Sequence, residues 1–220
     1  MDGDSLAVVM HGLEEYLERS ARVPGWTRNE EAAELSRITF SLSDGCVIVE
    51  VGSFLGSGTI LLAGPRQMRG SGKVHCVDPF DCSGDSFSIP HYNNILATLG
   101  GGSVRDRFNE NIRQAGLSDW IQVHRGRATD IAAKWSTPID MLFLDGDHSR
   151  VGAWQAYESW SPFLKAGGVI ALHNSQPGPH TPDHDGNLWV VKREIHSPQY
   201  SNIRLIDTTT FADKANNLRA

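Results

Sequence analysis

The sequence has few cysteines and no long apolar segment. Its three cysteines, Cys46, Cys76 and Cys82, are an odd number, which does not suit a disulfide framework. Two of them lie within apolar segments, as buried thiols do in a reducing compartment. No segment approaches the roughly 18 apolar residues that span a bilayer, and the acidic start MDGDSLAVV lacks the basic region of a secretory signal. We therefore expect a cytoplasmic protein with no membrane partner.

The sequence also lacks an excess of basic residues. Lysine and arginine total 20 against 26 acidic residues, which gives a formal net charge of -6. Proteins that bind nucleic acid usually show the opposite balance. We therefore expect no nucleic-acid partner.

Short apolar segments alternate with longer segments of helical periodicity from residue 46 onward. This pattern predicts strands over 46–51, 73–78, 120–124, 139–145, 169–173 and 203–207. It predicts helices over 57–69, 91–99, 104–116, 129–135, 150–164 and 187–196. Two further helices are expected before the first strand, over 4–20 and 28–42.

Strands that alternate with helices at this spacing indicate an α/β fold. We expect a Rossmann-like, mostly parallel sheet of about seven strands with helices on both faces. The 220 residues suit a single domain, with a helical cap over 1–44 and the Rossmann-like core over 45–220. The two N-terminal helices are expected to cover the site or to form the surface of a homodimer.

A glycine-rich segment, EVGSFLGSGT over 50–59, follows the first predicted strand. Gly52 permits a sharp turn, Gly56 lets the next helix begin close to a ligand, and Ser57 is a candidate N-cap. Such a turn suits a cofactor that contains a nucleoside, or it serves only to join the strand to the helix. Asp78 ends the second strand, where an acid accepts hydrogen bonds from the ribose hydroxyls of such a cofactor.

The spacing of these glycines is shared with the nicotinamide-dependent short-chain dehydrogenases. Those enzymes use a Tyr-xxx-Lys pair to move a proton beside the hydride. The position four residues after each tyrosine is here occupied by Ser20, Leu96, Ser161 or Arg204. Because none of these is a lysine, the dehydrogenase chemistry is excluded.

Acidic and imidazole side chains follow the fourth and fifth predicted strands. Asp145, Asp147 and His148 come after the fourth strand, and His173 and Asn174 after the fifth. The carboxyl ends of parallel strands meet at one edge of the sheet, where ligands bind. These five side chains are therefore expected to lie together beside the glycine turn.

Five segments between residues 46 and 175 resemble, in this order, the motifs of class I S-adenosylmethionine (SAM)-dependent methyltransferases: VEVGSFLGSGT, VDPF, HRGRATD, FLDGDHS and LKAGGVIALHN. The Asp-Gly-Asp-His segment resembles the branch that contains bacterial sugar and macrolide O-methyltransferases, with catechol-type enzymes as more distant relatives. The resemblance implies SAM as the cofactor and O-methylation of a small-molecule acceptor such as a sugar, a polyketide or another secondary metabolite.

The resemblance also implies roles for single residues. The SAM-binding positions would be Glu50, Gly52, Ser53, Gly56, Ser57, Asp78, Arg127, Ala128 and Asp145. His148 would be the general base and Asp145 its catalytic partner. Asp145, His173 and Asn174 would bind Mg²⁺ or another divalent cation.

Two questions stay open on the sequence. One carboxylate that the related enzymes carry is missing here, and Mg²⁺ prefers oxygen ligands, so metal use is open. The reaction class is open as well, because N-methylation without a metal and SAM or nucleotide binding without catalysis both fit the motifs. The loop over 174–186 and the segment 80–92 are expected to border the acceptor.

Overall fold

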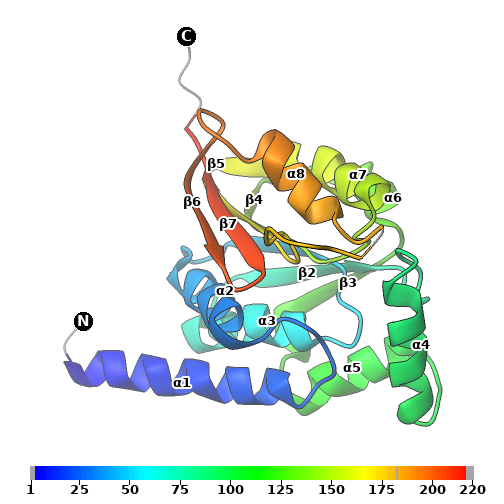
Figure 1. The fold of residues 1–220 in the computed structure, drawn as a ribbon. Coiled ribbons are helices and arrows are strands. Elements are labelled where there is room, and N and C mark those ends of the chain that lie inside the picture. Colours follow the sequence, from blue (N-terminus) through cyan, green and yellow to red (C-terminus); the bar gives the residue numbers. More distant parts are fainter. Residues whose placement is uncertain (1–2, 182, 217–220) are drawn as a thin grey trace.

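A sheet of seven strands forms the centre of the fold in the computed structural model, which describes residues 3–181 and 183–216 (Figure 1). The strands are β1 (Val47–Val51), β2 (Lys73–Asp78), β3 (Ile121–Arg125), β4 (Ile139–Leu144), β5 (Leu164–Leu172), β6 (Tyr200–Ile206) and β7 (Thr209–Lys214). Their order is β3-β2-β1-β4-β5-β7-β6, and β7 runs antiparallel to both of its neighbours. The predicted α/β class with a mostly parallel sheet is confirmed.

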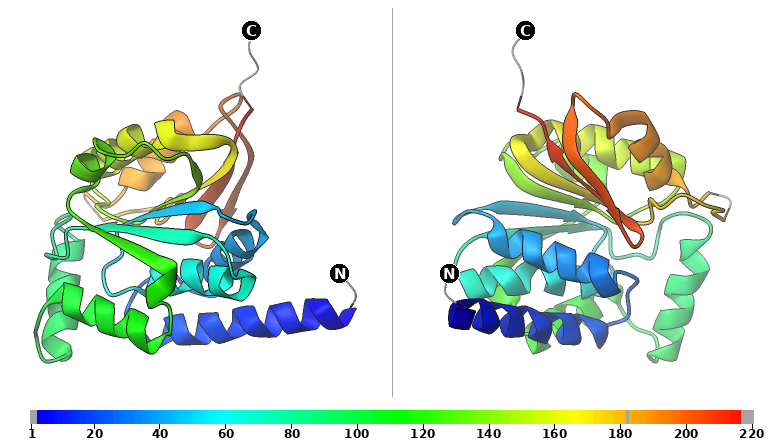
Figure 2. Two further views of the ribbon diagram at one scale, coloured as in Figure 1. Left: turned by 180° about the vertical axis from the view of Figure 1, so that it is seen from behind. Right: turned by 60° about the vertical axis from the view of Figure 1, so that its left-hand side comes forward.

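Helices cover both faces of the sheet (Figure 2). One face carries α1 (Gly3–Ala21), α2 (Asn29–Ser41), α3 (Ser57–Arg69) and α5 (Val104–Gln114), and the other carries α6 (Ala128–Ala132), α7 (Arg150–Trp160) and α8 (Gly186–Glu194). Helix α4 (Ser88–Thr98) stands at the carboxyl edge of the strands. Successive strand residues face opposite layers, so Ile48 belongs to the core under α3 and Val49 to the core under α7.

The C-terminal hairpin differs from the prediction, which placed a single strand at 203–207. The chain turns at Asp207 and Thr208 and returns as β7, which inserts between β5 and β6. Asp207 adopts a positive φ of 50°, a conformation that aspartate tolerates, so the turn needs no glycine and gave no signal in the sequence. The helix predicted over 150–164 ends at Trp160, because a 3₁₀ turn that contains Pro162 follows it.

The N-terminal helices α1 and α2 lie along α3 on one face of the sheet. It is the loop between them that reaches the site, where Pro24 and Trp26 line a cavity. Val8 and Met10 are exposed on α1, and the homodimer stays a prediction. Within the described residues, no helix combines the length and the apolar character that a membrane span requires.

Candidate active site

The glycine turn after β1 is packed against the end of β4. Gly52 has a φ of +91°, and a Cβ atom there would lie 2.4 Å from the carbonyl oxygen of Asp145. Only glycine permits this approach. The expected cap is wrong, because Gly56 is the N-cap of α3 and Ser57 its first residue. The Ser57 hydroxyl accepts a hydrogen bond from Arg28 Nη1 at 2.7 Å, so the N-terminal region braces the turn.

Glu50 is a buried carboxyl group at the end of β1. Ser53 Oγ donates a hydrogen bond to Glu50 Oε2 at 2.7 Å, and Thr59 Oγ1 donates to the same oxygen. Burial raises the pKa of Glu50 to about 8, although these two hydroxyls oppose the rise. Glu50 is therefore mostly protonated at neutral pH, and a cationic ligand beside it would favour its ionised form.

Asp78 supports the glycine turn through its carboxylate. Its Oδ2 accepts hydrogen bonds from the backbone N–H groups of Ser53 at 2.8 Å and Phe54 at 2.9 Å. Burial raises the pKa of Asp78, and these backbone donors oppose the rise. Asp78 also lines a cavity together with Arg127 and Ala128, and its contact with a ribose stays a prediction.

His173 lies between two carboxylates. Its Nδ1 is 2.6 Å from Asp145 Oδ1, and its Nε2 is 3.5 Å from Glu31 Oε1. Each ring nitrogen thus faces a carboxylate oxygen, an arrangement that favours the imidazolium form of the ring. Burial would lower the pKa of His173, but Asp145 and Glu31 raise it to about 10. In the same way, burial would raise the pKa of Asp145, but His173 and His148 hold it well below its usual value.

Glu31 reaches this group from α2 and was not predicted as a site residue. Its Oε2 accepts hydrogen bonds from the backbone N–H and the hydroxyl of Thr208, at 3.1 and 2.6 Å, and from the Thr209 hydroxyl at 2.8 Å. Its Oε1 accepts a hydrogen bond from the backbone N–H of Arg28 at 3.3 Å and lies 3.5 Å from His173 Nε2. A glutamate in an amphipathic helix is normally exposed, so the sequence gave no signal for this role.

His148 is buried beside Asp145. Its Nε2 is 3.5 Å from Asp145 Oδ1, and its Nδ1 is 3.4 Å from Asn187 Nδ2. The amide of Asn187 has a fixed orientation, because its Nδ2 also donates to the carbonyl of His173 at 2.7 Å. Nδ1 of His148 therefore faces a donor and Nε2 faces an acceptor, which favours the tautomer protonated at Nε2. Asn187, at the start of α8, was not predicted.

Asp85, also not predicted, joins the two segments that border the cavity. Its Oδ1 accepts hydrogen bonds from the backbone N–H of Ser88 at 3.0 Å and from His184 Nδ1 at 3.1 Å, and its Oδ2 accepts from the backbone N–H of His148 at 3.3 Å. Burial would raise the pKa of Asp85, but His184 and Ser88 hold it well below its usual value. His184 keeps its Nε2 lone pair, which lies 3.4 Å from the amide nitrogen of Asn174.

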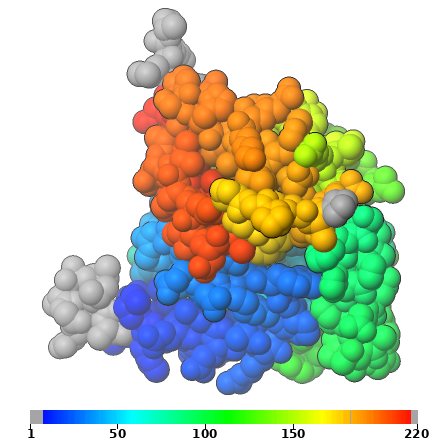
Figure 3. Space-filling model, in the orientation of Figure 1, coloured from blue at the N-terminus to red at the C-terminus, as the bar shows by residue number. Residues whose placement is uncertain are grey.

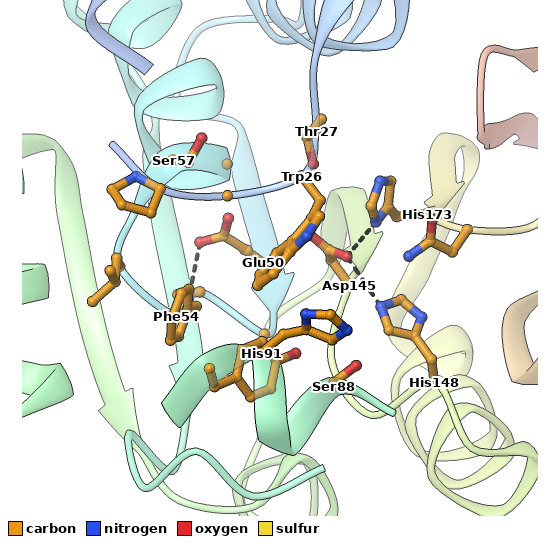
Figure 4. A pocket seen from close by; sticks show the side chains of 18 of the residues that line it. Trp26, Thr27, Glu50, Phe54, Ser57, Ser88, His91, Asp145, His148 and His173 are labelled. Atoms are coloured by element: carbon orange, nitrogen blue, oxygen red, sulfur yellow. Dashed lines mark hydrogen bonds and ion pairs between the residues drawn. The ribbon is translucent and has the colours of Figure 1, made fainter. Parts of the chain in front are cut away.

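The site contains two adjoining cavities. We call the first the histidine cavity (Figure 4); its lining includes Glu50, Gly52, Ser53, Ser57, Asp145, His148, His173, Asn174 and His184, with Trp26, Phe54 and Tyr92 as an aromatic wall. We call the second the Asp78 cavity; its lining includes Asp78, Arg127, Ala128 and Asp147. Both cavities share Gly52, Phe54, Tyr92 and Asp145.

The structure thus brings the predicted residues together, with one exception. Gly56 lines neither cavity, and a Cβ atom there would meet the side chains of Ile112 and Phe108 in the core. The segment 80–92 and the loop 174–186 border the histidine cavity through Tyr92 and His184, and their contact with the acceptor stays a prediction. In Figure 3, the loop before α8 (yellow to orange) and α4 (green) are visible on the same face of the molecule.

The candidate metal ligands of this site are one carboxylate and two imidazoles, whereas Mg²⁺ prefers oxygen ligands. Among the described residues, Asp145, His148 and His173 have candidate ligand atoms within 4.8 Å of one another. Two ligands at right angles on one Mg²⁺ ion, each about 2.1 Å from it, would lie about 3 Å apart. Asp145 Oδ1 and His173 Nδ1 are only 2.6 Å apart and share a proton. A metal ion at this position would have to displace that proton.

Comparison with known proteins identifies the family. A family model described as a methyltransferase domain matches residues 49–175, which is more than half of the chain. The chain belongs to this methyltransferase family. The methyltransferase predicted from the sequence motifs is therefore confirmed.

Solved structures show the same fold at low sequence identity. Cofactor-bound Rv0187 from MTB is 16% identical, with a TM-score of 0.64 over 98% of this chain and 92% of that one. The O-methyltransferase from Bacillus cereus in complex with SAH is 18% identical, with a TM-score of 0.60 over 93% and 91%. TomG from Streptomyces achromogenes, an O-methyltransferase in complex with SAM, is 16% identical, with a TM-score of 0.61 over 93% and 90%.

Proposed function

We propose that this methyltransferase transfers a methyl group from SAM to a hydroxyl group of a small molecule. The observation that carries the proposal is the junction of the two cavities at Gly52 and Asp145. A donor that lies along the glycine turn would have its nucleoside in the Asp78 cavity and its sulfonium beside Asp145. Its methyl group would then point into the histidine cavity, where the acceptor binds.

The position of the cavities supports SAM as the donor. Open α/β sheets bind ligands at the carboxyl ends of the strands where the strand order reverses, which is here between β1 and β4. TomG and the Bacillus cereus enzyme, which share this fold, are complexes with SAM and SAH. We assign Glu50 and Ser53 to the methionine part of SAM, Asp78 to the ribose, and Arg127 with Ala128 to the border of the adenine.

Methyl transfer requires alignment of donor and acceptor and removal of the acceptor proton. Displacement at the sulfonium is in-line, so a cavity that fixes the acceptor contributes several kcal/mol to catalysis, on the order of 7–11 kcal/mol at best. An aliphatic hydroxyl does not ionise at neutral pH, so a base must lie within hydrogen-bond reach of it. Histidine titrates in this range.

Two histidines of the cavity are candidates for this base. His148 is the base that the sequence predicted, and it lies beside Asp145 at the junction. Its favoured tautomer, however, directs an N–H group at Asp145 and its lone pair at Asn187. His184 is hydrogen-bonded through Nδ1 to Asp85, and its Nε2 lies 3.4 Å from the amide nitrogen of Asn174, which also lines the cavity.

Calorimetry with SAM, SAH and NADH tests the donor. We expect SAM and SAH to bind and NADH not to bind; a chain that binds NADH and ignores SAM would overturn the proposal. A screen of sugars, polyketides and catechols, read by SAH release and by mass spectrometry of the product, tests the acceptor. Methylation of amines alone would replace the O-methyl assignment with N-methylation. Tight SAM binding without turnover of any acceptor would favour the non-catalytic alternative.

A further inference from the structure

Arg28, in the loop between α1 and α2, lies directly behind the wall of the histidine cavity. Its guanidinium donates from Nη1 to Ser57 Oγ at 2.7 Å and to the carbonyl of Thr27 at 2.9 Å, and from Nη2 to the carbonyl of Val23 at 2.9 Å. All three acceptors are neutral, and the half-buried side chain forms no ion pair in the described part of the chain. We propose that Arg28, through its contact with Ser57, forms the subsite that binds the carboxylate of the methionine part of SAM.

The charges of SAM and of the cavity support this assignment, which rests on the proposed function. The methionine part of SAM carries an ammonium group and a carboxylate on the same carbon atom. Glu50 accounts for the ammonium group and leaves the carboxylate without a partner. The described residues that line the histidine cavity include Glu50 and Asp145 but no lysine or arginine. Because a carboxylate beside these two acids requires a nearby cation, Arg28 supplies the missing charge.

The loop that carries Arg28 approaches Ser57 closely. A Cβ atom at Gly25 would lie 2.6 Å from Ser57 Cβ and 2.9 Å from Ser57 Oγ, so only glycine permits this approach. On the other side of Ser57, a Cβ atom at Gly58 would lie 2.7 Å from Glu50 Oε1. Ser57 is therefore in contact with Arg28 and one residue away from the contact with Glu50. The positive and the negative group flank the same part of the glycine turn, as the two charges of one amino acid require.

The Ser57 hydroxyl connects Arg28 with the cavity, which Ser57 lines. Because Ser57 Oγ accepts the hydrogen bond from Arg28, its own hydrogen is available to an acceptor. The acceptor in the structure is Ser20, whose Oγ lies 3.0 Å from Ser57 Oγ. A carboxylate in the cavity would take the place of Ser20, and the positive charge of Arg28 would strengthen its hydrogen bond. Arg28 is thus a positioning residue, and Ser57 makes the contact with the ligand.

Decarboxylated SAM, which lacks only the carboxylate, is the probe for this subsite. Calorimetry of the full chain with SAM and with decarboxylated SAM measures the contribution of the carboxylate. We expect the wild type to bind SAM at least about tenfold more tightly than decarboxylated SAM. In Arg28→Gln, the affinity for SAM should fall by about tenfold to 100-fold, whereas the affinity for decarboxylated SAM should change by less than about twofold.

Two further substitutions of arginine control for charge and position. Arg28→Lys keeps the charge without the planar guanidinium, so it should retain part of the preference for SAM. Arg22→Gln is the matched control at the start of the same loop, since the Arg22 side chain is 78% exposed and pairs only with Glu18 at 3.9 Å. It should leave both affinities unchanged.

An equal loss of affinity for both ligands in Arg28→Gln would mean that Arg28 has only a structural role, and it would overturn the inference. A wild type that binds SAM and decarboxylated SAM equally well would also overturn it, and this comparison does not depend on the folding of any variant. Ser57→Ala removes the hydroxyl and leaves the guanidinium in place. It should also reduce the preference for SAM over decarboxylated SAM.

These readouts separate the inference from the proposed function. If the wild type bound neither SAM nor SAH nor decarboxylated SAM, the proposed donor would be wrong and the inference would fall with it. If SAM bound but no acceptor were methylated, only the proposed methyl transfer would fall, because the carboxylate subsite needs no acceptor. If SAM were turned over without any preference for its carboxylate, the inference alone would fall.

Discussion

Asp85 and His184 are 99 residues apart in the sequence and are hydrogen-bonded beside the histidine cavity, with 3.1 Å between Asp85 Oδ1 and His184 Nδ1. The pair has the geometry of an aspartate that orients a histidine base, with Nδ1–H toward the carboxylate and Nε2 toward the substrate side. It also connects the segment before α4 with the loop before α8.

The variants His184→Gln and His148→Gln decide which ring is the base. We expect His184→Gln to lower kcat by about 10²–10⁴-fold with little change in SAM affinity, because it removes the imidazole that Asp85 orients. The measurement is kcat with the acceptor found in the screen, together with calorimetry for SAM. His180→Gln is the control, since the His180 ring contacts the carbonyl of Gln176 at 2.7 Å in the same loop. A loss confined to His148→Gln would assign the base to His148.

Asp85→Asn is expected to lower both activity and stability. The Asp85 carboxylate accepts hydrogen bonds from His184 and from the backbone N–H groups of Ser88 and His148. Because the variant removes the charge of this buried acceptor, we expect a loss of about 2–4 kcal/mol in the free energy of unfolding. Urea unfolding measures the loss. Asp81→Asn, in the same segment, removes an exposed carboxylate that caps only Ser83, so it should cost less than about 1 kcal/mol. Equal losses in both variants would argue against a special role of Asp85.

Glu50 makes SAM binding depend on pH. Burial raises its pKa to about 8 in the free protein, so it is mostly protonated at pH 7. If the ammonium group of SAM binds beside it, the pKa falls and a proton is released. Calorimetry at pH 7 in buffers of different ionisation enthalpy should show this release, and the release should disappear above pH 8 and in Glu50→Gln. If SAM binding released no proton at pH 7, the assignment of Glu50 to the methionine part of SAM would be contradicted.

The raised pKa of Glu50 also makes the stability of the folded protein depend on pH. The folded protein holds a proton on Glu50 that the unfolded chain has lost between about pH 4.5 and 8. The contribution of Glu50 to stability therefore falls as the pH rises through this window. Glu50→Gln should remove this fall, so the variant should gain stability relative to the wild type at pH 8 and show no gain at pH 4, as measured by thermal unfolding.

Gly52→Ala tests the contact between the glycine turn and β4. The added Cβ atom would lie 2.4 Å from the carbonyl oxygen of Asp145, at a φ of +91°. We expect a loss of about 2–4 kcal/mol in the free energy of unfolding and weaker SAM binding. Gly45→Ala is the matched control, since Gly45 has a φ of +71° with no atom within 4 Å of the added Cβ, so it should cost about 1–2 kcal/mol and leave SAM affinity unchanged.

Because His75 is half-buried, we expect the folded protein to lose stability in mild acid. Its Nδ1 lies 2.9 Å from His124 Nε2, and burial, aided by His124, lowers the pKa of His75 to about 4. Between about pH 6.5 and 4 the unfolded chain binds a proton at this residue that the folded protein does not, so stability falls as the pH falls through this window. Denaturant unfolding from pH 8 to 4 measures this slope. His75→Gln should reduce it, whereas His11→Gln, at a side chain that is 89% exposed, should not.

The order of strands and helices, the glycine turn and the group after β4 could be predicted from the sequence because each has a local signal. Apolar periodicity indicates the elements, glycine marks the turn at Gly52, and polar residues at the ends of buried strands mark the ligand edge. The right-handed connection of parallel strands then brings Asp145, His148 and His173 to one edge without further information.

The partners of these residues were decided by the tertiary structure alone. Glu31 meets His173 because α2 packs beside the β6–β7 turn, and Asp85 meets His184 because two long loops close over the same cavity. Neither Glu31 nor Asp85 stands in a local sequence pattern that indicates its role. Strand β7 was not predicted either, because it depends on β5 and β6 for its hydrogen bonds. The environments of the histidines follow from these long-range contacts, so the sequence indicated which rings reach the site but not which carboxylate or amide each ring nitrogen faces.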